Sequence, residues 1–200
     1  KGFFKYNVKL NLDKLRNTLR TTLIDIWEYV IPIWKISGLF KSIKSKKDLE
    51  KFIQERSAHV SQTTLYGYLK TRIGVKYIAM MEDEVFLKSI NIAKWNIYVV
   101  ALADCAFYVF SYLVSEKNLK ENDCKEIFLN ILENEKKNGL SNEIFDRGKK
   151  NFLDRLNKVN FSNYHLNDPF KESGEALYYW SPIADELKSL DKKIVLNSIH

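Results

Sequence analysis

The residues best suited to chemistry lie in the stretch Arg56–Tyr77, most of which belongs to a helix predicted over about residues 48–73. The side of this helix that we expect to face the core contains Leu49, Ile53, Val60 and Gly67. Arg56 lies within about 20° of Leu49 and Gly67 on a helical wheel, so we expect it on the core side. Because arginine stays charged, it needs a buried acceptor there. Asp104, half-way along an apolar helix, is the expected partner, because an unpaired buried charge costs several kcal/mol. Three neighbours complete this predicted polar cluster: His59, Thr63 and Tyr66.

Two interpretations of the polar cluster remain open. In the first, Arg56 and Asp104 form an ion pair that holds two helices in register. In the second, the cluster is a ligand or active site inside a helical bundle, with His59 as a base. Gly67 in mid-helix favours a close approach of a neighbouring backbone, since glycine there is otherwise unfavourable.

Recognisable motifs of catalysis or metal binding are absent from the sequence. The three histidines have no partner at metal-ligand spacing, and neither a glycine-rich phosphate loop nor a G-x-S-x-G nucleophile elbow occurs. Cys105 and Cys124 have no paired spacing and are expected to be reduced thiols of a cytoplasmic protein. We therefore predict no catalytic residue, no metal and no cofactor.

The periodicity of apolar residues predicts an all-α fold. We expect a single irregular or orthogonal bundle of about six to eight helices over residues 1–200, because alternating strand patterns are absent. After an amphipathic helix at Leu12–Val30, the predicted helices cover about 48–73, 83–115, 121–138, 142–159 and 181–198. Gly74 and Gly139 are expected to end two of them, and Ser181–Pro182 to start the last.

The segment Trp95–Val114 is apolar on every side and has the length of a membrane span. Asn96 and Asp104 interrupt it, and a charge in the centre of a lipid-facing helix costs about 2.5–3.5 kcal/mol. We therefore predict a buried central helix and no transmembrane span.

The N-terminal region is basic. Residues 1–50 contain eleven Lys or Arg and five Asp or Glu, which supplies +6 of the net charge of +7. Residues 1–10 alternate polar and apolar side chains, as in an extended arm. Residues expected to bind an acidic partner are Lys5, Lys9, Lys14, Arg16, Arg20, Lys41, Lys44, Lys46 and Lys47. Aromatic residues expected at an interface are Phe3, Phe4, Tyr6, Trp27 and Trp34.

These features favour a non-catalytic binding or accessory protein. It would dock its basic N-terminal face on an acidic partner, preferably the inner face of a membrane or a membrane-attached complex. One alternative is an RNA-binding or ribosome-binding protein that uses the aromatic and basic arm. Another is a hydrolase-type enzyme with a buried site at Arg56, His59 and Asp104.

Three segments carry a resemblance to a known family: Arg56–Tyr77, Ser89–Trp95 and Tyr179–Ile199. Over about residues 48–199 the chain resembles a family of small alphaproteobacterial helical proteins of unknown function, some of which are labelled esterases. The resemblance implies a helical fold and supplies no catalytic residues. Because this chain lacks a nucleophile elbow, esterase activity is not predicted from it.

Overall fold

The structure is a computed structural model, which describes residues 43–117 and 120–196. The predicted arm, the Leu12–Val30 helix, the five interfacial aromatic residues and the basic residues up to Lys41 lie outside the described residues. The expectation of one domain over residues 1–200 therefore stays a prediction.

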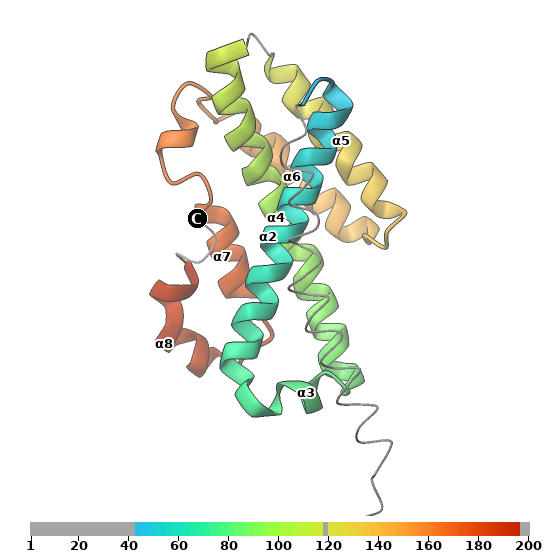
Figure 1. Ribbon diagram of the computed structural model, residues 1–200, viewed down its shortest axis with the longest axis vertical. Coiled ribbons are helices and arrows are strands. Elements are labelled where there is room, and N and C mark those ends of the chain that lie inside the picture. Colours follow the sequence, from blue (N-terminus) through green and yellow to red (C-terminus); the bar gives the residue numbers. More distant parts are fainter. Residues whose placement is uncertain (1–42, 118–119, 197–200) are drawn as a thin grey trace, which may run out of the picture. The chain divides into compact units, whose positions relative to one another are not determined.

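The described residues are helical and contain no strand, which confirms the predicted all-α bundle (Figure 1). The longer helices are α2 (Lys46–Ile73), α4 (Glu84–Lys117), α5 (Glu121–Lys136), α6 (Asn142–Leu156), α7 (Lys171–Trp180) and α8 (Asp185–Leu196). Shorter elements are the 3₁₀ turn η2 (Gly74–Lys76), the one-turn α3 (Tyr77–Met80) and the 3₁₀ turn η3 (Tyr164–Leu166).

Local sequence signals place the ends of the first helices. The Ser45 hydroxyl accepts from the amide of Asp48 at 3.1 Å, and the Asp48 carboxylate accepts from the amide of Ser45 at 3.1 Å. This reciprocal cap starts α2. Gly74 ends it with φ at 60°, a conformation that favours glycine, as predicted. Asp83 then caps α4 by accepting from the amides of Val85 and Phe86 at 2.8 and 2.9 Å.

Helix α4 lies at the centre of the described bundle. It contacts α2, α5, α6, α7 and η3, and most residues of Trp95–Val114 are buried. The predicted central apolar helix is therefore confirmed. Glu84–Val114 is long and apolar enough to cross a membrane, but 67% of its most apolar window is buried against the rest of the protein. Packing in the bundle accounts for this pattern.

Two hydrophobic clusters stabilise the bundle. The larger one joins α4 from Trp95 onward to α5, α6 and the start of α2, and includes Phe128 and Phe107 stacked on either face of Phe152. The smaller one joins α4 up to Ile97 to α3, α7, α8 and the end of α2. Helices α2 and α4 thus contribute to both clusters.

The buried side of α2 differs from the predicted one. Leu49 and Ile53 are buried as expected, but Val60 and Gly67 are exposed. The buried line continues instead through Ser57, Ser61, Leu65 and Leu69. The two serines tolerate burial because each donates to the carbonyl four residues earlier, at 2.8 and 2.7 Å. Because these two mid-helix residues are polar yet buried, the apolar pattern alone predicts a different buried side of α2.

The close helix contacts occur at other glycines than predicted. A Cβ on Gly67 would meet nothing within 4 Å, so the close approach expected there is wrong. A Cβ on Gly148 of α6 would overlap the side chain of Val99 of α4, and one on Gly174 of α7 would overlap the carbonyl of Leu196 of α8. Both glycines therefore let their helices pack closely.

The last helix begins later than predicted. Helix α8 starts at Asp185, whereas Ser181 is the residue that ends α7. The Ser181 hydroxyl donates to the carbonyl of Leu177 at 2.6 Å, so it satisfies the end of one helix and does not cap the next.

Candidate functional site

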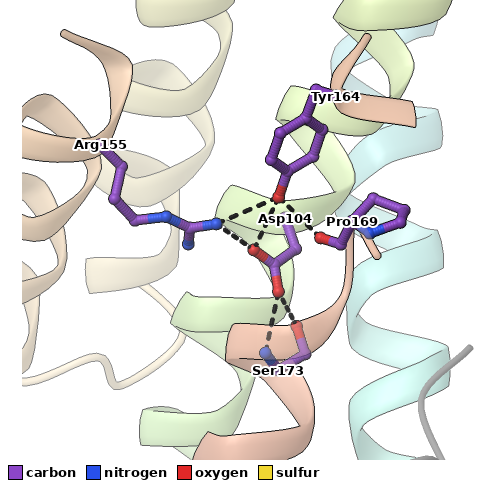
Figure 2. Close-up of polar contacts among 5 residues, drawn as sticks. All are labelled: Asp104, Arg155, Tyr164, Pro169 and Ser173. Atoms are coloured by element: carbon purple, nitrogen blue, oxygen red, sulfur yellow. Dashed lines mark hydrogen bonds and ion pairs between the residues drawn. The ribbon is translucent and has the colours of Figure 1, made fainter. Parts of the chain in front are cut away.

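Asp104 lies at the centre of a polar cluster inside the described bundle (Figure 2). Its Oδ1 atom accepts from the guanidinium of Arg155 on α6, and its Oδ2 atom accepts from the amide and the hydroxyl of Ser173 on α7. The Tyr164 hydroxyl accepts from Arg155 at 3.1 Å. Its single proton points to the carbonyl of Pro169 at 2.6 Å, because Asp104 Oδ1 is farther away at 3.2 Å. Both carboxylate oxygens are therefore occupied by protein donors.

Burial and charge act against each other in this cluster. Burial raises the pKa of Asp104, and the Arg155 charge and the Ser173 hydrogen bonds partly offset that rise. Burial disfavours the cation of Arg155, but the adjacent Asp104 carboxylate outweighs burial and raises the pKa of Arg155. Burial beside the same carboxylate raises the pKa of Tyr164. The arrangement ties α4 to α6, η3 and α7, and it leaves no unsatisfied acceptor for a ligand.

The predicted pairing of Arg56 with Asp104 is wrong. Asp104 is fully buried and paired with an arginine, as expected, but that arginine is Arg155. Arg56 is half-buried on α2 with its guanidinium carbon 5.6 Å from the centre of the Phe52 ring. The side of α4 that faces α2 carries Cys105, which lies beside Ser57, and Asp104 lies about 100° away on the helix. Asp104 consequently points toward α6 and α7.

The other members of the predicted cluster do not converge on Asp104 either. The Thr63 hydroxyl donates to the carbonyl of His59 at 2.6 Å and lies 3.4 Å from His59 Nδ1, on an exposed part of α2. Tyr66 is half-buried and packs beside the smaller hydrophobic cluster. The structure therefore does not assemble the predicted hydrolase site of Arg56, His59 and Asp104.

A second arginine of α6 repeats the contact that Arg155 makes. Arg147 donates to the side-chain oxygen of Asn96 on α4, and the Asn96 amide donates to the carbonyl of Ile92 at 2.8 Å. Arg147 precedes Arg155 by eight residues, and Asn96 precedes Asp104 by eight residues. The two helices therefore run parallel and in register, with both polar interruptions of α4 bound by arginines of α6.

Two further buried acids join other helices. Glu135 of α5 accepts at 2.7 Å from both Gln54 of α2 and Tyr98 of α4, and at 2.8 Å from Asn138. Between α2 and α8, Asp191 of α8 pairs with Arg72 of α2 and accepts from the Tyr68 hydroxyl at 3.4 Å. The carboxylate of each acid is occupied by hydrogen bonds or an ion pair that join it to neighbouring helices, which is typical of structural polar contacts.

A serine and a histidine contact each other between α4 and η3. Ser111 Oγ lies 2.8 Å from His165 Nδ1, donates to the carbonyl of Phe161 at 2.6 Å and accepts from the amide of His165 at 3.1 Å. Since the hydroxyl has one proton and gives it to Phe161, Nδ1 must carry the proton of the ring. His165 therefore cannot remove a proton from Ser111 through Nδ1, and this pair is unsuited to nucleophilic catalysis.

A shallow groove of about 450 Å³ lies between α7 and α8. Its described lining is Glu175, Ala176, Tyr178, Tyr179, Trp180, Lys192 and Leu196. Lys188 and Lys192 each lie 5.9 Å from the centre of the Tyr178 ring. The groove is separate from the Asp104 and Ser111 contacts, and no group of acids, histidines and cysteines suited to a metal occurs among the described residues.

The described part of the predicted basic face is small. Lys44 and Lys47 are exposed, but Lys46 is bound to Asp123 at 2.9 Å and to Glu126 at 2.6 Å. Those two carboxylates raise the pKa of Lys46. Lys46 therefore helps to attach the start of α2 to α5 and is less available to a partner than its neighbours.

The arginines of α6 are the residues that sequence reasoning missed. Arg147 and Arg155 are eight residues apart, as are Asn96 and Asp104, and this equal spacing is a signal in the sequence that could have identified them.

Comparison of the chain with known protein families, with curated proteins and with solved structures found no match.

Proposed function

We propose that this chain is a non-catalytic helical binding protein that docks its basic N-terminal region on an acidic partner, with an anionic membrane surface as the preferred one. The observation that carries the proposal is the distribution of charge. Residues 1–42 contain eight Lys or Arg and three Asp or Glu, a net charge of +5. Residues 43–200 contain 24 Lys or Arg and 22 Asp or Glu, a net charge of +2.

The chemistry of the described residues supports a binding role. Asp104, Glu135 and Asp191 bond neighbouring helices, and the hydroxyl of Ser111 is engaged with a backbone carbonyl. The positive and negative charges of the described bundle nearly balance, so the bundle itself should contribute little to the binding of an acidic partner. A basic docking segment gains about 1 kcal/mol per Lys or Arg near an anionic lipid surface.

Aromatic residues among the basic ones favour a membrane surface. Trp27 lies near the end of the amphipathic stretch Leu12–Val30 and Trp34 follows it, and tryptophan is typical of the boundary between lipid headgroups and acyl chains. An RNA partner would use the same charges but would require stacking of bases on Phe3, Phe4 and Tyr6.

Co-sedimentation of the full chain with lipid vesicles tests the proposal. We expect binding to vesicles that contain phosphatidylserine or phosphatidylglycerol, weaker binding to neutral phosphatidylcholine vesicles, and loss of binding as salt rises. Equal binding to neutral and anionic vesicles would contradict the charge-based mechanism. Tighter binding to single-stranded RNA than to anionic vesicles, at matched salt, would reject the membrane in favour of RNA.

A further inference from the structure

Helix α8 carries an exposed apolar stripe. Leu187, Leu190 and Ile194 are 45%, 77% and 72% exposed, at steps of three and four residues. These are the steps of the a and d positions in a coiled-coil heptad. Figure 1 shows α8 at the edge of the helices drawn in colour, and α7 is its main neighbour among them. The buried side of α8, which contains Asp191 and Val195, lies about 100° around the helix from the stripe.

We propose that this stripe binds a second copy of the chain, with the two α8 helices antiparallel about a two-fold axis. A stripe of this kind is self-complementary when the same surface meets itself, as two-fold interfaces require. In this arrangement the leucines and Ile194 of one copy interdigitate with those of the other and are removed from water.

Charges beside the stripe determine the antiparallel direction. Glu186 and Lys193 are exposed, lie on the same flank of the stripe, and form no ion pair with another described residue. Seven residues separate them, which is about two helical turns. Antiparallel packing therefore brings Glu186 of each copy near Lys193 of the other. Parallel packing would instead place Glu186 at the level of Glu186 of the other copy, and Lys193 at the level of the other Lys193.

The other flank of the stripe and the ends of α8 favour a second copy over an anionic surface. Asp191, on that flank, is already paired with Arg72 of α2. Asp185 and Glu186 place two carboxylates in the first turn of α8, where an anionic surface would repel them.

A helix of 12 residues is about 18 Å long, so the contact is small and we expect a dissociation constant of roughly 10–100 µM.

Sedimentation equilibrium of the full chain, over a micromolar to millimolar concentration series at low salt, tests the proposal. We expect a monomer–dimer equilibrium. Leu190→Glu should abolish it, because it inserts two charges into the apolar contact. Ser189→Glu adds the same charge about 130° from the centre of the stripe and should leave the dimer intact. A wild-type chain that stays monomeric throughout, or a dimer that tolerates Leu190→Glu, would overturn the proposal.

Charge reversal tests the direction of packing. Glu186→Lys and Lys193→Glu should each weaken the dimer about tenfold, since each replaces two attractions by two repulsions. The variant with both changes should recover wild-type affinity within about threefold, because the pairs are restored with exchanged signs. Failure to recover would overturn the antiparallel arrangement. The four side chains changed in these tests, at Glu186, Ser189, Leu190 and Lys193, are all exposed, so circular dichroism and thermal melting should match the wild type and show that the variants fold.

Discussion

The guanidinium of Arg155 on α6 donates to the fully buried carboxylate of Asp104 on α4. Eight residues earlier on each helix, Arg147 donates to Asn96. The two polar residues that interrupt an otherwise apolar central helix are thus both bound by arginines of one neighbour. These contacts fix the register of α4 against α6 and explain why polar residues are tolerated at these positions.

Replacing one partner of the Arg155–Asp104 pair with an apolar residue should destabilise the fold. Arg155→Met leaves Asp104 buried without its cation, and we expect a loss of about 3 kcal/mol in the free energy of unfolding. The double variant with Asp104→Leu should lose at least about 1 kcal/mol less than the sum of the two single losses, because neither charge is left alone. Urea denaturation measures all three variants. Lys150→Met, an exposed change on the same helix, should stay within about 0.5 kcal/mol of wild type. Additive losses would show that the pair is not coupled.

Two glycines in helices should respond to alanine in opposite directions. At Gly148 the new Cβ would overlap a Val99 methyl group, so Gly148→Ala should cost about 1–3 kcal/mol. At Gly67 nothing lies within 4 Å, so Gly67→Ala should stabilise the protein by about 0.5–1 kcal/mol through its better helix propensity. Thermal or urea unfolding of the two variants checks both signs. Stabilisation by Gly148→Ala would contradict the close packing of α6 on α4.

The thiol of Cys105 should be unreactive at neutral pH. Burial raises its pKa from the ordinary value of 9.0 to about 11, and the thiolate is the reactive form. At pH 8 the native thiol should therefore react with iodoacetamide about a hundredfold more slowly than in the urea-unfolded chain, and its rate should rise with pH until about pH 11. Cys124→Ala isolates the signal of Cys105. Equal rates in the native and unfolded protein would contradict the raised pKa of this thiol.

The ring of His165 should carry its proton on Nδ1 when neutral. Ser111 gives its proton to the carbonyl of Phe161 and can only accept from the ring. Nitrogen-15 NMR of the ring distinguishes the two neutral tautomers. Ser111→Ala removes the acceptor and should shift the population toward the Nε2–H form. If the Nε2–H form already dominates in the wild type, the assigned hydrogen bond is wrong, and a base acting on Ser111 would again be possible.

The sequence predicted the helices better than the contacts between them. The end of α2 and the start of α4 follow from Gly74 and Asp83, whose effects are local in the chain. The burial of α4 follows from its continuous apolar composition. These features depend on neighbours within a few residues, so the amino-acid order contains the required information.

The polar cluster could be predicted only in part. A buried Asp104 requires a cation, and this requirement follows from the sequence alone. Its partner depends on which side of α4 each helix covers, and that is determined by packing between segments about 50 residues apart in the chain. The serines at positions 57 and 61 resemble surface residues in composition, yet they are buried because each bonds within its own helix. The apolar pattern alone therefore places Arg56 on the core side of α2 and does not identify Arg155 as the partner of Asp104.

The proposal of a basic docking region is tested most directly by vesicle binding of two matched variants. The first replaces Lys5, Lys9, Lys14, Arg16 and Arg20 with glutamine, and the second replaces five exposed lysines of the described bundle, Lys51, Lys125, Lys149, Lys150 and Lys158. Both lose five positive charges. We predict that the first variant binds phosphatidylserine vesicles at least about a hundredfold more weakly than the wild type, since each basic residue near the surface contributes about 1 kcal/mol. The second should keep its affinity within about threefold at the same salt, because its changed residues lie outside the docking region. Equal losses in the two variants would show that only net charge matters, and would contradict docking through the N-terminal region.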